Sequence, residues 1–245
     1  MSILRFTPHD HSYTSISSED ATKWISVTSF IGNFKQPFDA DRIAEKSSKS
    51  KKSKWYGMTP EEIKAAWSAE ALRATTLGTW YHNCRESDIC SLETMERHGS
   101  TVPIFKPIEI DGTKFSPNQK LTDGVYPEHM VYLKSAGLCG QSDLVEVING
   151  VVHITDYKTN KEIKIEGYTN WEGITTKMNS PVAHLDDCNV NHYALQLSLY
   201  MYIILKHNPR LKPGDLTIHH IQFEALLILA LIEPFVYMRH LYHLK

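Results

Sequence analysis

Three charged residues near the middle of the chain, Asp143, Asp156 and Lys158, have the types and spacing that can bind a metal ion and activate water. Two apolar and β-branched runs joined by Asn149-Gly150 separate Asp143 from the other two residues. Asp143 precedes the first run, and Asp156 and Lys158 follow the second. Asn-Gly is the dipeptide most favoured in a two-residue type I′ turn, because both of its residues must adopt positive φ. The stretch from Gly140 to Lys158 therefore predicts a β-hairpin.

A two-residue turn sets Ile148 opposite Val151, and counting outward from this pair sets Asp143 opposite Asp156. Because side chains alternate between the two faces of a sheet, Lys158 lies on the same face as both acids. Like charges that face each other destabilise a sheet. The two carboxylates must therefore share a proton, flank a cation or be paired in another register.

A divalent cation is the simplest of these solutions, because Mg²⁺ and Mn²⁺ prefer carboxylate oxygens. Lys158 beside such an ion can orient or deprotonate a water molecule, or offset the charge that develops on a phosphate. In the alternative interpretation, Asp143 and Asp156 lie at strand ends in solvent, and Lys158 only neutralises one of them.

The hairpin motif resembles the PD-(D/E)XK nuclease superfamily, and in particular its RecB-like exonucleases, whose nuclease domains read G-x-x-D, an apolar hairpin and D-Y-K-T. The corresponding residues here are 140–143 and 156–159. Two further motifs of that subgroup occur in the same order, G-x-x-x-H at residues 78–82 and Q-x-x-x-Y at residues 196–200. The resemblance covers about Gly78 to Phe223 and is nearest to phage recombination exonucleases and the mitochondrial genome-maintenance exonuclease.

This resemblance implies a role for each motif residue. One or two ions of Mg²⁺ or Mn²⁺ would be held by Asp143, Asp156, the imidazole of His82 and the backbone carbonyl of Tyr157. Lys158 would orient or activate the water. The implied catalytic group also includes residues that position the strand or lie near the metal: Gln196, Tyr200 and Glu128.

Some of these residues have simpler interpretations. Glu128 is either the family's acidic residue on the strand before the hairpin or a surface glutamate. His82 and Glu86 share a helix face, and they form either a metal ligand with the partner that fixes its ring or an ordinary hydrogen-bonded pair. Gln196 on a buried helix either faces the active site or only bonds a neighbouring backbone group.

The implied fold is α/β, a PD-(D/E)XK nuclease core in which helices flank a central mixed β-sheet on both faces. An N-terminal region of strands and helices, residues 1–77, would shape the DNA channel, and residues 78–245 would form the core of one compact domain. The implied activity is metal-dependent exonucleolytic hydrolysis of DNA in recombination, repair or replication of a phage or bacterium. The alternatives are an endonuclease of the same fold, specific for a structure or sequence, and a non-catalytic DNA-binding module.

The surrounding elements can be read from periodicity, caps and breakers. We expect two helices before the hairpin, a strand directly before it, and a buried helix and a further strand after it. Their expected ranges are 59–74, 77 onwards, 128–133, 189–205 and 216–223. The long polar connection from residue 159 to residue 187 is a candidate binding loop.

Composition limits how the chain can contact DNA. With a net charge of −2 over 245 residues, no global positive field attracts nucleic acid, so any contact depends on local patches. One lysine-rich segment next to an aromatic residue can hold a single strand by phosphate contacts and stacking, or it can be only a solvated loop. Its candidate DNA-binding residues are Lys49, Lys51, Lys52, Lys54 and Trp55.

The four cysteines form no C-x-x-C pair. This spacing argues against a zinc ribbon, a disulfide framework and the iron–sulfur cluster of some RecB-like proteins, and it favours a reducing compartment. The N-terminus lacks the apolar core of a signal peptide, and the longest apolar run is too short to span a bilayer. We therefore expect a cytoplasmic protein that does not contact membranes.

Overall fold

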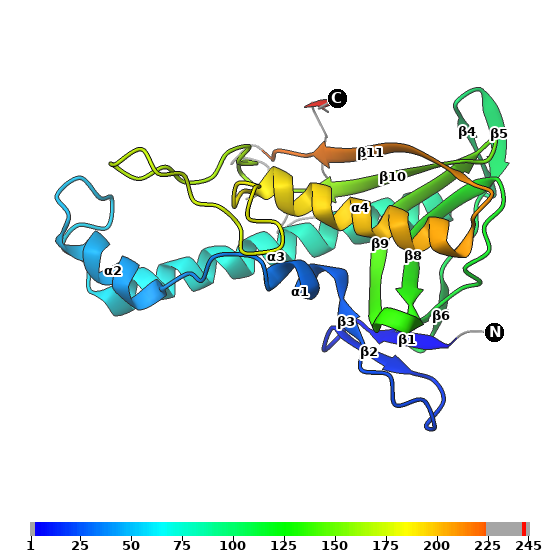
Figure 1. Cartoon of the computed structure of the whole chain (residues 1–245), viewed down its shortest axis with the longest axis horizontal. Coiled ribbons are helices and arrows are strands. Elements are labelled where there is room, and N and C mark those ends of the chain that lie inside the picture. The colour runs from blue at the N-terminus through cyan, green and yellow to red at the C-terminus, as the bar shows by residue number, and fades with distance from the viewer. Residues whose placement is uncertain (1–2, 224–241, 244–245) are drawn as a thin grey trace.

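The predicted hairpin is present in the structure, a computed structural model that describes residues 3–223 and 242–243 (Figure 1). Asn149 and Gly150 have φ of 51° and 74°, as a type I′ turn requires. They join β9 (Leu138–Ile148) to β10 (Val151–Lys158). Pairing begins at Ile148 with Val151, which confirms the predicted register at the turn.

The hairpin lies inside a mixed sheet. β8 (Gly124–Leu133) is antiparallel to β9 on the edge away from β10, and β11 (Lys212–His220) is parallel to β10. Two short strands complete the sheet, β3 (Ile25–Ser26) beside the start of β9 and β12 (Tyr242–His243) beside β11. The strands predicted before and after the hairpin therefore exist, and each begins four residues earlier than expected.

Helices cover both faces of this sheet, with α4 (Asn189–His207) in front of it and α3 (Pro60–Cys90) behind it in Figure 1. α4 begins at the predicted residue. It packs on the face formed by alternate hairpin residues, and the buried side chains of that face are Val145, Val147, Val152 and Ile154. The predicted α/β fold class, a mixed sheet between helices, is confirmed at this level.

The prediction of two helices before the hairpin is wrong. α3 is one helix of 31 residues that starts with a capping box between Thr59 and Glu62 and with Pro60 at its first turn. Residues 74–77 contain neither Gly nor Pro, and the hydroxyl of Thr75 donates to the carbonyl of Ala71, so nothing there ends the helix. The expected domain boundary at residue 77 therefore falls inside a continuous helix.

Smaller elements surround the sheet and α3. β1, β2, β6 and β7 form a four-stranded antiparallel sheet, and β4 and β5 form a separate hairpin. Two short helices, α1 and α2, precede α3. Their bounds are β1 (Leu4–Thr7), β2 (Ser12–Ser15), α1 (Val27–Gly32), α2 (Ala40–Lys49), β4 (Thr94–Arg97), β5 (Ser100–Pro103), β6 (Ile108–Ile110) and β7 (Thr113–Phe115). None of the helices in the described part of the chain has the length and apolar character needed to cross a membrane.

Candidate active site

The site lies where β9 and β10 separate. Their pairing ends at Leu144 with Thr155, so the predicted pairing of Asp143 with Asp156 is not formed. Instead, Oδ2 of Asp143 accepts a hydrogen bond of 2.7 Å from the backbone N–H of Tyr157. The Asp143 carboxylate thus accepts from a backbone N–H of β10, and β9 and β10 are no longer paired at this point.

Three side chains converge at this opening. Among residues 3–223, His82, Glu128 and Asp143 form the one group of three possible metal ligands whose ligand atoms all lie within 4.8 Å of one another. Nδ1 of His82 lies 3.4 Å from Oδ1 of Asp143 and 3.9 Å from Oε1 of Glu128. Two carboxylates and one imidazole suit Mn²⁺ or Mg²⁺, so we call this group the metal triad.

Glu128 reaches the metal triad because β8 is distorted at this residue. Its φ is +48°, a left-handed conformation that costs a non-glycine residue about 1–3 kcal/mol. Pro127 and His129 on either side pair with β9, whereas Glu128 does not. Its side chain is only 14% exposed, which excludes the interpretation as a surface glutamate.

His82 is tightly held by its neighbours. Burial lowers the pKa of His82, but the carboxylates of Asp143 and Glu128 outweigh burial and raise it to about 10. Nε2 of the protonated ring donates to the carbonyl of Tyr157 at 3.1 Å. The Tyr157 carbonyl, expected to be a metal ligand, therefore orients the His82 ring and leaves Nδ1 facing the carboxylates.

Asp156 is not part of the metal triad, and other side chains hold its carboxylate. Its side chain is buried, with Oδ2 2.6 Å from Nζ of Lys158 and Oδ1 accepting a 3.2 Å hydrogen bond from Nε2 of Gln196. Burial and then the charge of Asp143 raise the pKa of Asp156 to about 7, and Lys158 opposes this shift only in part. The interpretation of Asp143 and Asp156 as solvated strand ends is therefore wrong.

Lys158 remains a cation in this setting. Burial lowers the pKa of Lys158, but the charges of Asp156 and Asp143 outweigh burial and raise it. Its ammonium also lies 4.8 Å from the ring centroid of Tyr193 on α4, a residue that no sequence motif marks. The adjacent carboxylates and ring thus fix the position of the charge.

Tyr200 does not face the solvent as a strand-binding residue would. It is 3% exposed and packs against β9 at Gly140. A Cβ on Gly140 would lie 2.7 Å from the Tyr200 ring, so this close approach requires glycine. Tyr200 thus contacts a motif residue, the first of the G-x-x-D motif, and its role in positioning a strand stays a prediction.

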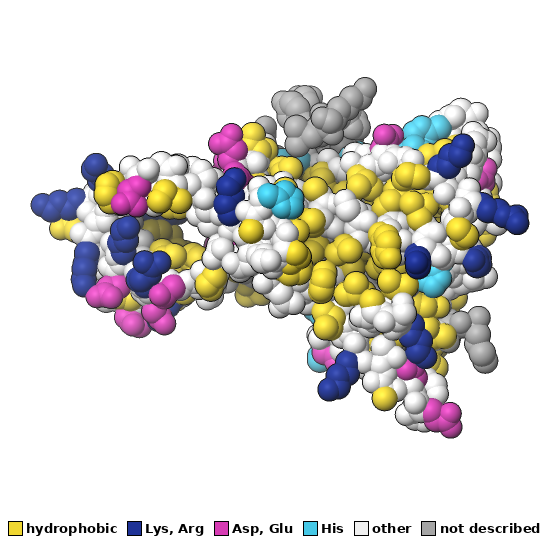
Figure 2. Space-filling view, in the orientation of Figure 1, with side chains coloured by type: hydrophobic (Ala, Val, Ile, Leu, Met, Phe, Trp, Pro, Cys, Tyr) yellow, Lys and Arg dark blue, Asp and Glu magenta, His cyan; other side chains and the backbone are white. Residues whose placement is uncertain are grey.

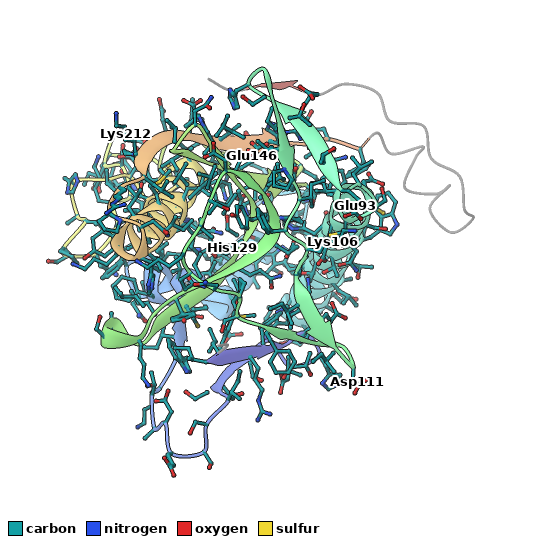
Figure 3. The ribbon with its side chains drawn as sticks, turned by 90° about the vertical axis from the view of Figure 1, so that its right-hand side faces the viewer. Glu93, Lys106, Asp111, His129, Glu146 and Lys212 are labelled. Atoms are coloured by element: carbon teal, nitrogen blue, oxygen red, sulfur yellow. The ribbon has the colours of Figure 1, made fainter. Side chains whose placement is uncertain are left out.

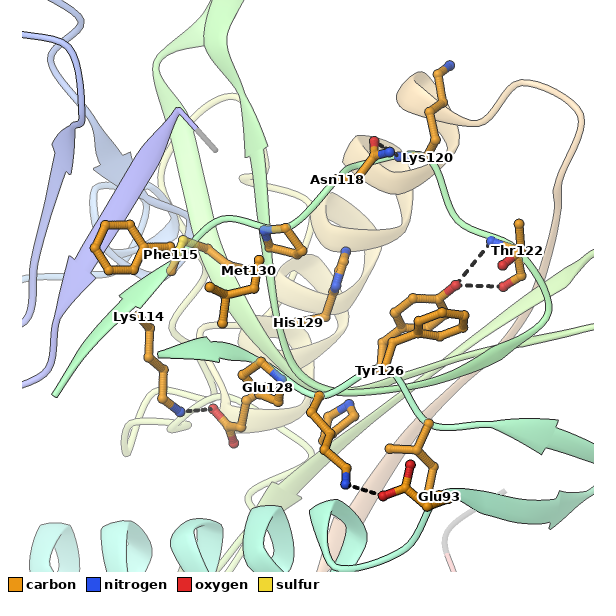
Figure 4. Close-up of a pocket in the computed structure, with 17 residues that line it drawn as sticks. Glu93, Lys114, Phe115, Asn118, Lys120, Thr122, Tyr126, Glu128, His129 and Met130 are labelled. Carbon is orange, nitrogen blue, oxygen red and sulfur yellow. Dashed lines mark hydrogen bonds and ion pairs between the residues drawn. The ribbon is translucent and has the colours of Figure 1, made fainter. Parts of the chain in front are cut away.

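Sequence reasoning missed Lys114, which belongs to the short strand β7. Its ammonium lies 4.0 Å from Glu128, as Figure 4 shows. The same ammonium lies 2.8 Å from Glu86. Glu86 therefore binds Lys114, and its expected role of fixing the His82 ring is wrong. No motif marks Lys114, because only the packing of the small sheet brings it to the site.

The lysine-rich segment lies at the far end of α3. With about 1.5 Å of rise per residue, the start of this helix is roughly 33 Å from His82. In Figure 2, Lys and Arg side chains gather at the end of the molecule that carries α2. Lys49 pairs with Glu45 at 2.6 Å and Lys54 lies over the ring of Trp55, while Lys51 and Lys52 are exposed.

Comparisons of this chain with protein-family models, curated proteins and solved structures gave no match.

Proposed function

We propose that this chain is a metal-dependent deoxyribonuclease with a RecB-like PD-(D/E)XK core, and that it acts from the end of a DNA strand. The observation that carries the proposal is the convergence of His82, Glu128 and Asp143 within 4.8 Å, at the point where the central hairpin opens. The Asp156–Lys158 ion pair lies directly beside this opening. A surface ion pair or a core histidine would not explain why three elements direct charged side chains to one point.

Each residue has a defined task in this proposal. The metal triad would hold Mg²⁺ or Mn²⁺, which when bound polarises the scissile phosphate and lowers the pKa of a water molecule. Lys158 stays protonated because its pKa is raised, so it donates hydrogen bonds to the water or to a phosphate oxygen. Asp156 and Gln196 hold Lys158 in place.

The substrate we propose is a DNA strand that extends from the site toward the lysine-rich segment. A distance of roughly 33 Å along α3 corresponds to about ten nucleotides at about 3.4 Å each. Lys51 and Lys52 are exposed there and can contact phosphates. We also propose a cytoplasmic location, since all four cysteines are free thiols, as a reducing compartment keeps them.

The test is digestion of end-labelled single- and double-stranded oligonucleotides and of a circular DNA with Mg²⁺, with Mn²⁺ and with EDTA. We expect cleavage of linear DNA that requires the metal. Lys158→Met should lower kcat at least about 100-fold, since removal of a group that stabilises transition-state charge typically costs roughly 10²–10³. Lys134→Ala is the matched control, because Lys134 pairs with Asp20 far from the site and should leave the rate unchanged.

Two outcomes would contradict the proposal. One is DNA binding by the unaltered protein with no cleavage in Mn²⁺, which would indicate a non-catalytic module. The other is equal cleavage by the unaltered protein and Lys158→Met. Cleavage of the circle at the same rate as linear DNA would retain the chemistry but indicate an endonuclease.

A further inference from the structure

A cavity of about 550 Å³ adjoins the metal triad on the side of β8 that faces β7. Figure 3 views the molecule from this side, with Lys106, Glu93 and His129 labelled near the cavity, and Figure 4 shows its lining. Glu128 lines the cavity and also belongs to the metal triad. Lys114 lines the cavity too, and its ammonium lies 4.0 Å from Glu128. A ligand in the cavity would therefore lie next to the proposed scissile bond.

One wall of the cavity is an aromatic platform. The rings of Phe105 and Tyr126 stack with their centroids 4.6 Å apart and their planes 12° from parallel. Tyr126 is buried, and its hydroxyl is fixed by two hydrogen bonds to the backbone of Thr122. Tyr126 covers one face of the Phe105 ring and Gly124 lies close to its Cδ2 and Cε2 atoms, while 41% of the residue is exposed.

Three lysines, Lys106, Lys114 and Lys120, are among the lining residues, together with two acids, Glu93 and Glu128. Lys114 is bound to Glu86, and Lys120 donates to the carbonyl of His207, so Lys106 is the lysine best placed to meet an anion. Lys106 pairs with Glu93, whose side chain is 84% exposed, and such exposed pairs contribute little. Its ammonium can therefore turn toward an anion at small cost.

The rim of the cavity between β7 and β8 is held in place by buried amides. Gln119 donates from Nε2 to the carbonyl of Met130 at 3.0 Å. Asn208, just after α4, accepts from the N–H of Leu121 at 2.9 Å and donates to the carbonyl of Gln119 at 2.7 Å. The cavity is therefore built before any ligand arrives, as small-molecule sites usually are.

We propose that this cavity holds the terminal nucleotide of the strand, with its base stacked on the exposed part of the Phe105 ring and its phosphate near Lys106. The inference rests on the proposed function, since it places that nucleotide beside Glu128 and the scissile phosphate. A planar base suits the aromatic platform, and a phosphate suits the Lys106 ammonium, which is held by an exposed pair with Glu93. The limited volume admits a strand end more readily than a continuing duplex, which explains exonucleolytic action.

The test uses 2′-deoxyadenosine 5′-monophosphate as the probe and measures its binding to the full chain by calorimetry in EDTA. We expect measurable binding that weakens about tenfold in Phe105→Ala, the range for loss of one base–aromatic stack. Phe105→Tyr should retain the affinity. Phe38→Ala is the matched control, because Phe38 is also an exposed ring at 68% but lies between α1 and α2 and does not line the cavity.

The result that would overturn the inference is binding of equal strength in Phe105→Ala and the unaltered protein, or no binding at millimolar concentration. Because the assay contains no metal, it is independent of cleavage. Active protein that does not bind the nucleotide would reject the cavity and retain the nuclease. Phe105-dependent binding without any cleavage would reject the nuclease and retain the nucleotide-binding cavity.

Discussion

Gly140 shows how one missing side chain decides the geometry of the site. On one side of β9, β3 pairs with Leu138 and Cys139, and β10 pairs with residues from Leu144 onwards. Gly140 lies between these two paired segments and has no partner on that side among the described strands. The Tyr200 ring packs on the Gly140 backbone, in the position that a side chain at residue 140 would occupy. Three residues further on, the same open edge frees Asp143 to turn toward His82.

Gly140→Ala should therefore destabilise the fold. The new methyl group would lie 2.7 Å from the Tyr200 ring, which is buried and cannot move aside freely. Overpacking of this kind costs about 1–3 kcal/mol, measurable as a lower free energy of unfolding in urea. The double variant Gly140→Ala/Tyr200→Val removes the clash, and equal stability of the single variant and the unaltered protein would show that the contact is not tight.

If His82 is a metal ligand as proposed, it would couple metal binding to pH. In the metal-free protein its pKa is raised to about 10, so it is protonated at neutral pH and must lose that proton to become a ligand. Metal affinity should rise with pH up to about 10, the pKa of His82 in the metal-free protein, and His82 should release its proton when the ion binds. Calorimetry near neutral pH in two buffers with different ionisation enthalpies measures this release.

His82→Ala should abolish this proton release. His9→Ala is the control, because His9 is exposed in the loop between β1 and β2 and lies outside the site. Identical heats in the two buffers for the unaltered protein would contradict the assignment of His82 as a ligand.

At the scale of elements, local sequence patterns predicted the hairpin turn and the starts of two helices. The Asn149-Gly150 turn, the start of α4 and the Thr59 cap of α3 all follow from rules about adjacent residues. The kink of β8 at Glu128 does not, since a left-handed glutamate is favoured by no local rule. Only contacts with His82 and Lys114 give that conformation a reason.

The segment between α2 and α3 allows a test of the proposed path of the strand. Lys51→Ala/Lys52→Ala should weaken binding of a single-stranded oligonucleotide and lower the slope of log K against log salt by about 1.4, or about 0.7 for each phosphate that a lysine no longer neutralises. Lys134→Ala/Lys212→Ala removes the same charge elsewhere on the surface and should change neither quantity. An unaltered slope in the first variant would mean that the strand follows another path.

At the scale of the whole molecule, the site is assembled from segments far apart in the sequence. His82 comes from α3, Glu128 from β8, Asp143 from β9, and Asp156 with Lys158 from β10. Motif order was enough to choose these residues from the sequence. It was not enough to separate Asp156 from the metal triad, because that difference arises where two strands part and a buried lysine and glutamine take hold of one carboxylate.

The net charge of the sequence likewise does not show which charged groups lie together in the folded chain. A value of −2 indicates no general attraction for DNA, so the proposed DNA contacts depend on local cationic groups: Lys158 and Lys114 at the site, and Lys51 and Lys52 at the far end of α3. Lys114 could not be chosen from the sequence, because it lies in a three-residue strand whose docking depends on the small sheet.

The central claim is that His82, Glu128 and Asp143 bind one divalent ion. Its most direct test is anomalous diffraction from crystals of the protein soaked in MnCl₂. The account predicts a manganese peak about 2.0–2.3 Å from an oxygen of Glu128, an oxygen of Asp143 and Nδ1 of His82. A manganese-soaked crystal with no peak among these three side chains, or with the ion bound only elsewhere, would contradict it.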